Sequence, residues 1–437
     1  MPSRRRLLAI RISDAGRTGN VFQPGRAHGY IRNQPVRNLE LPSTRKPMST
    51  PRNTTPRIAL IISLSLSTTV LVLSAPGTPV AERMTRFVDE KEVAGAVTLV
   101  ASREKVIQVD AVGRADIAGE KPMQPDTIFW IASMTKPITG VAVQMLEEEG
   151  KLSLDDPVAK HIPELADLRT ADGKPVKPTI RHLLTHTSGM GEASPEESRA
   201  AKSLADLIPV YARKPVVFEP GARWQYCQSS INTAARIAEI VSGQAFPEFI
   251  ERRLFEPLGM KDTTFYLSPE QRSRLAKSYR RTPEGKLEEA EIMILAGKDP
   301  TSRDRYPAAN GGLFSTAPDY ARFCRMVLRG GELDGRRYLK AESVRRMTGI
   351  LTGDLETGFT PGNGWGLGLC VVKKPQGATA ALSAGSFGHG GVFGTQAWMD
   401  PEKDRVFILM VQRANFPNAD ASEVRRAFQE TAAAAAR

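Results

Sequence analysis

The sequence of 437 residues is poor in cysteine, with Cys227, Cys324 and Cys370 as the whole set. Three widely spaced cysteines are too few for a disulfide framework in an exported chain. Cys324 and Cys370 lie in apolar patterns and are predicted to be core residues. Cys227 has no positively charged neighbour in sequence to lower its thiol pKa, so packing is the better interpretation than a nucleophile. A disulfide-stabilised scaffold is thereby excluded.

The chain also has few acidic residues at its N-terminal end. Residues 1–57 hold 12 Lys/Arg and 2 Asp/Glu, and they carry most of the formal net charge of +12. Residues 76–437 hold 48 basic and 46 acidic residues, a net charge of only +2. The high pI therefore describes a basic leader, and it gives no argument that the folded part binds nucleic acid.

A long hydrophobic run is absent as well. Residues 58–75 carry no charge, but their apolar part is short for a membrane span, which needs about 20 residues. The basic start, apolar centre and small-residue end predict a secretory signal cleaved near Ser74 or Ala75, with an uncleaved signal anchor as the alternative. No cysteine lies near that end, which argues against a lipid anchor. We expect an exported protein, periplasmic or secreted, and Met48 is an alternative translation start to Met1.

The remaining pattern predicts an α+β fold. Helical periodicity at about 80–92 precedes a β-hairpin at 96–109, and three strand-like runs follow near the other end, at 364–372, 392–399 and 405–411. A C-terminal helix starts at about residue 419. We expect an antiparallel five-stranded sheet flanked by the N- and C-terminal helices, with an inserted, mostly helical lobe at about 138–330. The predicted domains are a disordered leader at 1–57, a signal at 58–75 and one enzyme domain at 80–430.

The motif Ser-x-x-Lys occurs three times, beginning at Ser43, Ser102 and Ser133. The first lies in the leader and the second in the turn of the predicted hairpin. Only Ser133 follows a strand-like segment and opens an apolar run that can form a buried helix.

Ser133 and Lys136 are three residues apart, so they share a helix face. If burial keeps the Lys136 amine neutral, it can take the proton of the Ser133 hydroxyl. Pro137 is tolerated only near the first turn of a helix, which puts Ser133 at a helix N-terminus. The free N–H groups there favour the negative charge that develops during acyl transfer.

Tyr226 is the candidate for passing the proton to a leaving group. It follows a Pro220-Gly221 turn and precedes a predicted helix, and a tyrosine hydroxyl close to an ammonium can act as a phenolate-like relay. The alternative is an aromatic side chain that packs under the loop.

The glycine-rich segment 385–392 provides the third element. Its glycines permit close backbone approach, so the N–H of Val392 can face the N–H of Ser133 across a bound carbonyl oxygen. His389 is expected to project into the cleft as a hydrogen-bond donor to substrate or to Tyr226. The alternative is a histidine that merely occupies a turn.

Together these segments resemble the serine β-lactamase and penicillin-binding superfamily, in its branch of class C β-lactamases, carboxylesterases and D-alanyl-D-alanine carboxypeptidases. The resemblance covers about 80–430. The matching stretches follow in order along the chain: 130–137 around Ser133, 149–157, 181–189, the segment of Tyr226, 256–260 and the Gly385–Val392 region.

The resemblance implies a β-lactamase/transpeptidase-like fold and an acyl-enzyme on Ser133, with Lys136 and Tyr226 exchanging its proton. The backbone N–H groups of Ser133 and Val392 would hold the oxyanion. Substrate-binding residues would be Gln228, His389, Gly390 and Gly391. No cofactor and no metal is implied, and four polar residues in the matched stretches would have structural roles: Asp155, Asp156, His182 and His186.

Two positions depart from the family pattern. Gln228 stands where the Tyr-x-Asn motif has asparagine, and it keeps the carboxamide one methylene further out. Ser230-Ile231-Asn232 fits an alternative Ser-x-Asn motif but lies inside the predicted helix. His389 stands where β-lactamases mostly have lysine, the permanent cation that binds a β-lactam or peptide carboxylate. This favours an esterase or peptidase over a strong β-lactamase.

The predicted function is an exported serine hydrolase that cleaves ester or amide bonds of small molecules or peptides through an acyl-serine. One alternative is a penicillin-binding-like or regulatory protein that has lost efficient deacylation, and another is an acyltransferase. We expect no nucleic-acid partner, and membrane contact only through an uncleaved signal. The loops around 306–310 and Trp365 are expected to set specificity.

Overall fold

The computed structural model describes residues 77–435. The predicted leader at 1–57 and signal at 58–75 lie outside the described residues. Within residues 77–435, no helix combines the length and apolar character needed to span a membrane.

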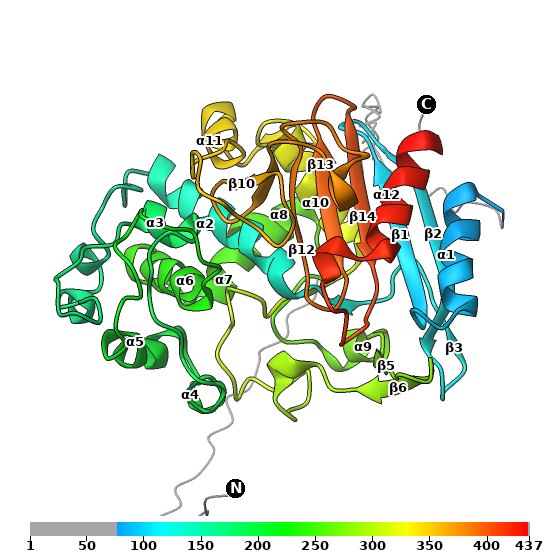
Figure 1. Cartoon of the computed structure of the whole chain (residues 1–437), viewed down its shortest axis with the longest axis horizontal. Helices are drawn as coiled ribbons and strands as arrows, with labels where there is room; N and C mark the ends of the chain where they lie inside the picture. The colour runs from blue at the N-terminus through cyan, green and yellow to red at the C-terminus, as the bar shows by residue number, and fades with distance from the viewer. Residues whose placement is uncertain (1–76, 436–437) are drawn as a thin grey trace, which may run out of the picture. The chain divides into compact units, whose positions relative to one another are not determined.

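Strands from the two ends of the described chain form one antiparallel sheet (Figure 1). Its order is β10-β11-β12-β13-β14-β1-β2-β3. The two ends meet where β1 pairs with β14, with Val97 opposite Met410. The bounds are β1 Gly95–Ala101, β2 Val106–Asp116, β3 Lys121–Pro122, β10 Asn363–Trp365, β11 Cys370–Val372, β12 Phe387–Gly390, β13 Gln396–Asp400 and β14 Arg405–Met410.

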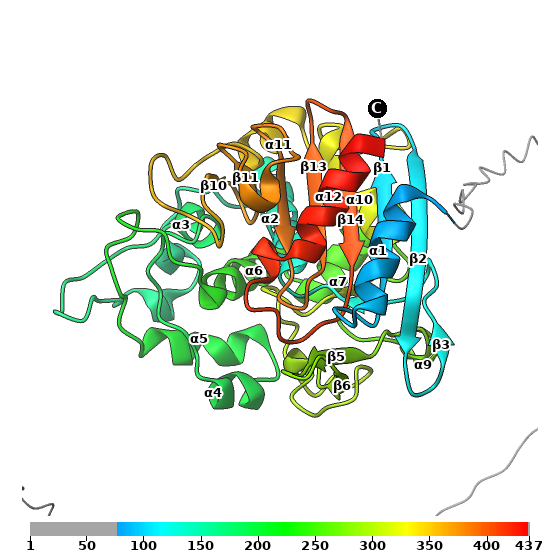
Figure 2. The ribbon, with the colours of Figure 1, turned by 45° about the vertical axis from the view of Figure 1, so that its right-hand side comes forward.

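Both faces of the sheet are covered. Helices α1 (Pro79–Asp89) and α12 (Glu423–Ala435) lie side by side on one face (Figure 2), where Phe87 and Phe428 join a buried cluster with Trp398 and Phe407. The other face packs on α10 (Ala317–Leu328) and α2 (Thr135–Glu148). Alternate residues of β1 therefore enter different clusters, and the whole strand is buried.

The segment between the sheet strands is mostly helical, as expected. Helix α2 packs on α6 (Gln228–Ser242), which also contacts α3, α5 and α7. Helix α6 ends at Gly243 in the left-handed conformation, and the Thr316 side chain caps the start of α10. The other helices are α3 Ile180–Leu184, α4 Pro195–Ala200, α5 Leu204–Ala212, α7 Phe246–Ile250, α8 Glu256–Leu258, α9 Pro269–Ser273 and α11 Ala341–Met347, and the small strand pairs are β4 (Phe129–Trp130) with β7 (Phe314–Ser315), β5 (Ser278–Arg281) with β6 (Leu287–Ala290) and β8 (Glu332–Leu333) with β9 (Arg336–Arg337).

The prediction of a five-stranded sheet is wrong in detail, because eight strands pair in it. The run 364–372, expected as one strand, is the hairpin β10–β11. Gly368 turns with a φ of +76°, and a Cβ there would lie 2.7 Å from the Lys136 carbonyl oxygen, so the turn packs closely on α2. Strand β12 is not among the predicted strand-like runs, since its sequence has no β-branched residue.

Candidate active site

Ser133 lies in a short 3₁₀ turn (Ala132–Met134) between strand β4 and helix α2, near the helix N-terminus predicted for it. Ala132 has a φ of +46°, which is strained for a residue with a Cβ. Two bonds fix the turn: the Thr135 hydroxyl donates to the Ala132 carbonyl at 2.7 Å, and the Tyr320 hydroxyl to the Met134 carbonyl at 2.7 Å. The strained turn leaves the Ser133 side chain partly exposed beside α2.

Lys136 is fully buried, and its amine is 3.1 Å from the Ser133 hydroxyl oxygen. The Nζ also donates to Gln228 Oε1 at 2.9 Å and to the Asn310 carbonyl at 2.6 Å. Burial lowers the pKa of Lys136 from 10.5 to about 7, although Glu192 acts in the opposite direction. A substantial fraction of the amine is therefore neutral at neutral pH and able to accept a proton from Ser133.

The Tyr226 ring lies against the same amine. The Lys136 Nζ is 4.5 Å from the ring centroid, and the ring packs on His186 and Phe359. Burial raises the pKa of the Tyr226 phenol well above 10, while a hydrogen bond with the Ser133 side chain acts to lower it. Burial therefore favours a protonated phenol near Ser133, and the proton relay through Tyr226 stays a prediction.

His389 lies in β12 and is buried rather than projecting into an open cleft. Its Nδ1 is 2.7 Å from the Gly390 carbonyl oxygen, which only accepts, so Nδ1 carries the proton. The Nε2, 3.3 Å from the Tyr226 hydroxyl, must then accept from that hydroxyl. The expectation of a donor to Tyr226 is thus corrected to an acceptor, because the adjacent carbonyl fixes the tautomer.

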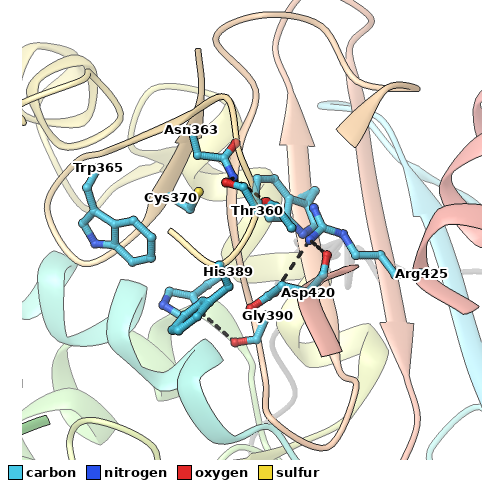
Figure 3. Close-up of a pocket in the computed structure, with 10 residues that line it drawn as sticks. Thr360, Asn363, Trp365, Cys370, His389, Gly390, Asp420 and Arg425 are labelled. Atoms are coloured by element: carbon cyan, nitrogen blue, oxygen red, sulfur yellow. Dashed lines mark hydrogen bonds and ion pairs between the residues drawn. The ribbon is translucent and has the colours of Figure 1, made fainter. Parts of the chain in front are cut away.

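A small pocket lies behind His389 (Figure 3), with room for about one water molecule. Arg425 reaches into it from α12, stacks 4.3 Å from the Trp398 ring centroid and donates to the Asp420 carbonyl at 2.6 Å. Burial, the Lys136 amine and more weakly Arg425 lower the pKa of His389 to about 3. His389 is therefore neutral at ordinary pH and cannot replace the lysine cation of β-lactamases.

The end of β12 meets the turn that holds Ser133. A Cβ on Gly391 would lie 2.8 Å from the Ile131 carbonyl oxygen and 3.3 Å from the Ala132 Cβ, so only glycine allows this approach. Gly390 is similarly confined by the side chains of Asp420 and Gln396. Val392 follows with 48% of its surface exposed, and its N–H donates no hydrogen bond to any residue in 77–435. That N–H is available to a bound oxygen.

Gln228 holds the amine rather than pointing only at substrate. Its Oε1 accepts from both Lys136 Nζ and Asn310 Nδ2, the latter at 2.8 Å. Sequence reasoning missed Asn310 as a partner of Lys136, and it missed Glu192, whose carboxylate accepts from the N–H groups of Gln228 and Ser229 at the start of α6. No local motif marks either residue, because both reach the site through loops.

The other polar residues in the matched stretches have structural contacts. Arg181 pairs with Asp155 at 2.8 Å, and Asp156 accepts from Lys160 and His161. His182 completes the capping box of α3. His186 accepts from the Cys227 N–H at 3.1 Å and packs on the Tyr226 ring, so it positions that tyrosine. In residues 77–435, no group of three or more His, Cys, Asp or Glu side chains is arranged to hold a metal ion.

The site combines a serine hydroxyl with a buried, partly neutral amine, and a free backbone N–H follows a glycine-rich strand beside them. This arrangement is typical of serine hydrolases. The family model named Beta-lactamase matches residues 80–432, and the chain belongs to this family. It is thus an enzyme of the serine hydrolase type on a β-lactamase/transpeptidase-like fold.

The chain is similar to the following three proteins. An uncharacterized protein of Mycobacterium tuberculosis is 36% identical, over 76% of this chain and 88% of that protein. Esterase EstB of Burkholderia gladioli is 29% identical, over 74% of this chain and 87% of that protein. The solved structure of EstCE1, described as a hydrolase with promiscuous acyltransferase activity, superposes with a TM-score of 0.68 at 24% identity, over 81% of this chain and 97% of that one.

Proposed function

We propose that the protein is an exported esterase that cleaves small ester substrates through an acyl-Ser133 intermediate. The contact of 3.1 Å between the Lys136 amine and the Ser133 hydroxyl, with an amine pKa of about 7, is the observation that carries the proposal. A neutral amine at this distance is in reach of the proton that must leave as the serine oxygen attacks.

In the first half-reaction, Ser133 Oγ bonds to the ester carbonyl carbon while its proton moves to Lys136. The N–H groups of Ser133 and Val392 stabilise the oxyanion. The Tyr226 phenol protonates the leaving alkoxide as the carbon–oxygen bond breaks, and the Lys136 ammonium returns its proton to Tyr226.

In the second half-reaction, water attacks the acyl carbonyl and gives a proton to Lys136. Tyr226 protonates Ser133 Oγ as the acyl group leaves, and Lys136 again reprotonates the phenol. Both half-reactions therefore end with a neutral amine and a neutral phenol.

Esters are favoured over β-lactams because His389 is neutral and buried. It provides no permanent cation for a substrate carboxylate beside β12. The name of the EstB relative also supports an esterase. Export rests on residues 58–75, and N-terminal sequencing of the natural protein tests it.

Hydrolysis of p-nitrophenyl butyrate by purified protein tests the proposed reaction. Ser133→Ala is expected to abolish turnover with unchanged thermal unfolding. Ser102→Ala is the matched control, since Ser102 begins another Ser-x-x-Lys motif but lies at the β1–β2 turn, and it should keep full activity. Unchanged turnover in Ser133→Ala refutes the assignment. Labelling of Ser133 without turnover would favour the binding protein, and an ester product with added alcohol would favour the acyltransferase.

A further inference from the structure

A second cavity of about 510 Å³ lies between helix α4 and the segments 291–298 and 305–306. Much of its wall is apolar or aromatic. Pro195, Met293, Ile294, Leu295 and Tyr306 contribute to this wall, and Arg305 also lines the cavity. Met293 is 62% exposed, which is unusual for a large apolar side chain and places apolar surface within reach of solvent.

Both sides of this cavity include residues whose neighbours reach the Ser133 site. Leu295 belongs to the same buried apolar cluster as Ala132, the residue before Ser133. On the other side, Tyr306 lies four residues before Asn310, whose N–H donates to Asn232 Oδ1 at 3.2 Å. Since the Asn310 carbonyl accepts from Lys136, the loop 306–310 joins the wall of the cavity to the Ser133 site.

Arg305 is the unusual member of the lining. Only 5% of it is exposed, and its guanidinium stacks 4.7 Å from the Tyr266 ring centroid while Nη2 donates to the Phe265 carbonyl. Its Nε and Nη1 have no hydrogen-bond partner, and no carboxylate in residues 77–435 forms an ion pair with it. A buried guanidinium without a counter-ion is costly, so this arrangement favours an incoming anion.

The other charged side chains of the lining already have partners. Arg199 pairs with Glu196, Lys298 with Asp304, and Glu291 accepts from the Gly297 N–H. An anion in the cavity would therefore meet Arg305 as its unpaired cation. A planar guanidinium matches a carboxylate through two parallel hydrogen bonds, whereas the apolar wall suits a hydrocarbon chain.

We propose that this cavity selects esters in which one arm is an apolar chain ending in a carboxylate, with Arg305 binding that carboxylate. The inference rests on the proposed function of Ser133. It identifies a substrate class: monoesters of medium-chain dicarboxylic acids, or esters of ω-hydroxy acids. Both carry the same anion at the end of the same kind of chain, and the experiment distinguishes them.

The experiment compares kcat/KM for two matched pairs of esters. Mono-p-nitrophenyl adipate and p-nitrophenyl hexanoate differ by the carboxylate on the acyl arm. The butyrate esters of 6-hydroxyhexanoate and of hexanol, followed in a pH-stat, differ by the carboxylate on the alcohol arm. In at least one pair, we expect the charged ester to be preferred by tenfold or more, through a lower KM.

Arg305→Gln is expected to reduce that preference by roughly 10- to 100-fold, the effect of losing a hydrogen bond between charged groups, with hydrolysis of the neutral ester nearly unchanged. Arg199→Gln, on the same wall but already paired, should keep the preference. Equal loss on charged and neutral esters in Arg305→Gln, or no preference in the wild-type protein, overturns the inference.

Inhibition of the wild-type protein provides a second measurement, which does not require the Arg305→Gln variant to fold. Octanoate should inhibit hydrolysis of p-nitrophenyl butyrate at least tenfold more strongly than octanol, and equal inhibition contradicts the proposal. If no Ser133-dependent hydrolysis of neutral esters is found, the proposed function fails. If neutral esters are hydrolysed without any charge preference, only the assignment of this cavity fails.

Discussion

The lowered pKa of Lys136 gives a prediction that links activity and stability through one buried amine. A fall from 10.5 to about 7 means that protonating the buried amine costs about 5 kcal/mol more than in water. If this amine is the base for Ser133, only its neutral form is active. The value of kcat/KM for a neutral ester should then fall about tenfold per pH unit below pH 7, to about one hundredth of its plateau at pH 5.

The same amine should make stability depend on pH. The unfolded chain holds the lysine proton up to about pH 10.5, while the folded chain releases it above about pH 7. Between these values the unfolded state binds more protons, so this residue makes the free energy of unfolding rise with pH. Lys136→Met removes the contribution, and the difference in unfolding free energy from wild type should shift by about 3 kcal/mol between pH 6 and pH 9.

The change with pH in the difference between the two unfolding free energies tests the lysine pKa more directly than the difference at any single pH. Lys136→Met also leaves the Asn310 carbonyl without the donor Lys136 and removes one of the two donors to Gln228 Oε1, a loss of about 1–3 kcal/mol for the carbonyl that does not vary with pH. Urea unfolding of both proteins at pH 6, 7, 8 and 9 measures the difference, and contributions from other titrating groups cancel. A difference that stays constant over this range would refute a depressed lysine pKa, and with it the amine as base.

The remaining predictions test the phenol and the glycine contact. Tyr226→Phe should lower kcat for p-nitrophenyl butyrate by about 10²- to 10⁴-fold with little change in KM, because the proton donor to the leaving group is lost; an unchanged kcat would contradict this role of the hydroxyl. Gly391→Ala should destabilise the fold by about 1–3 kcal/mol and lower kcat, since its Cβ would press on Ile131 and Ala132 and move Val392; unchanged thermal unfolding and activity would contradict the close approach.

Much of the fold was readable from local patterns. The β-rich run at 96–100 and the strand-like run at 405–411 predicted strands, and these form β1 and β14, which pair with each other. The number of strands in the sheet was predicted wrongly because of segments that are rich in glycine. Strand β12 and the turn between β10 and β11 form through pairing and close packing with distant segments, which leave no periodic signal along the chain.

In the candidate site, too, local contacts were predictable from the sequence and contacts between distant segments were not. Ser133 and Lys136 are one turn apart, so their contact of 3.1 Å follows from helix geometry and was predictable. The sequence also named Tyr226, His389 and the glycines. It gave the wrong role to His389, because the tautomer depends on the Gly390 carbonyl, and it missed Glu192, which reaches the start of α6 from a distant loop.

What the sequence determined by itself is the set of reactive groups and the local turn that presents the serine. What only the tertiary structure decided is their protonation. Burial makes the Lys136 amine partly neutral, and the groups around it come from Gln228 and from Asn310, which lies 174 residues after Lys136 in the chain. Burial also keeps the Tyr226 phenol protonated. Spacing along the chain sets which atoms can touch, whereas a pKa depends on how much water the whole fold removes from around them.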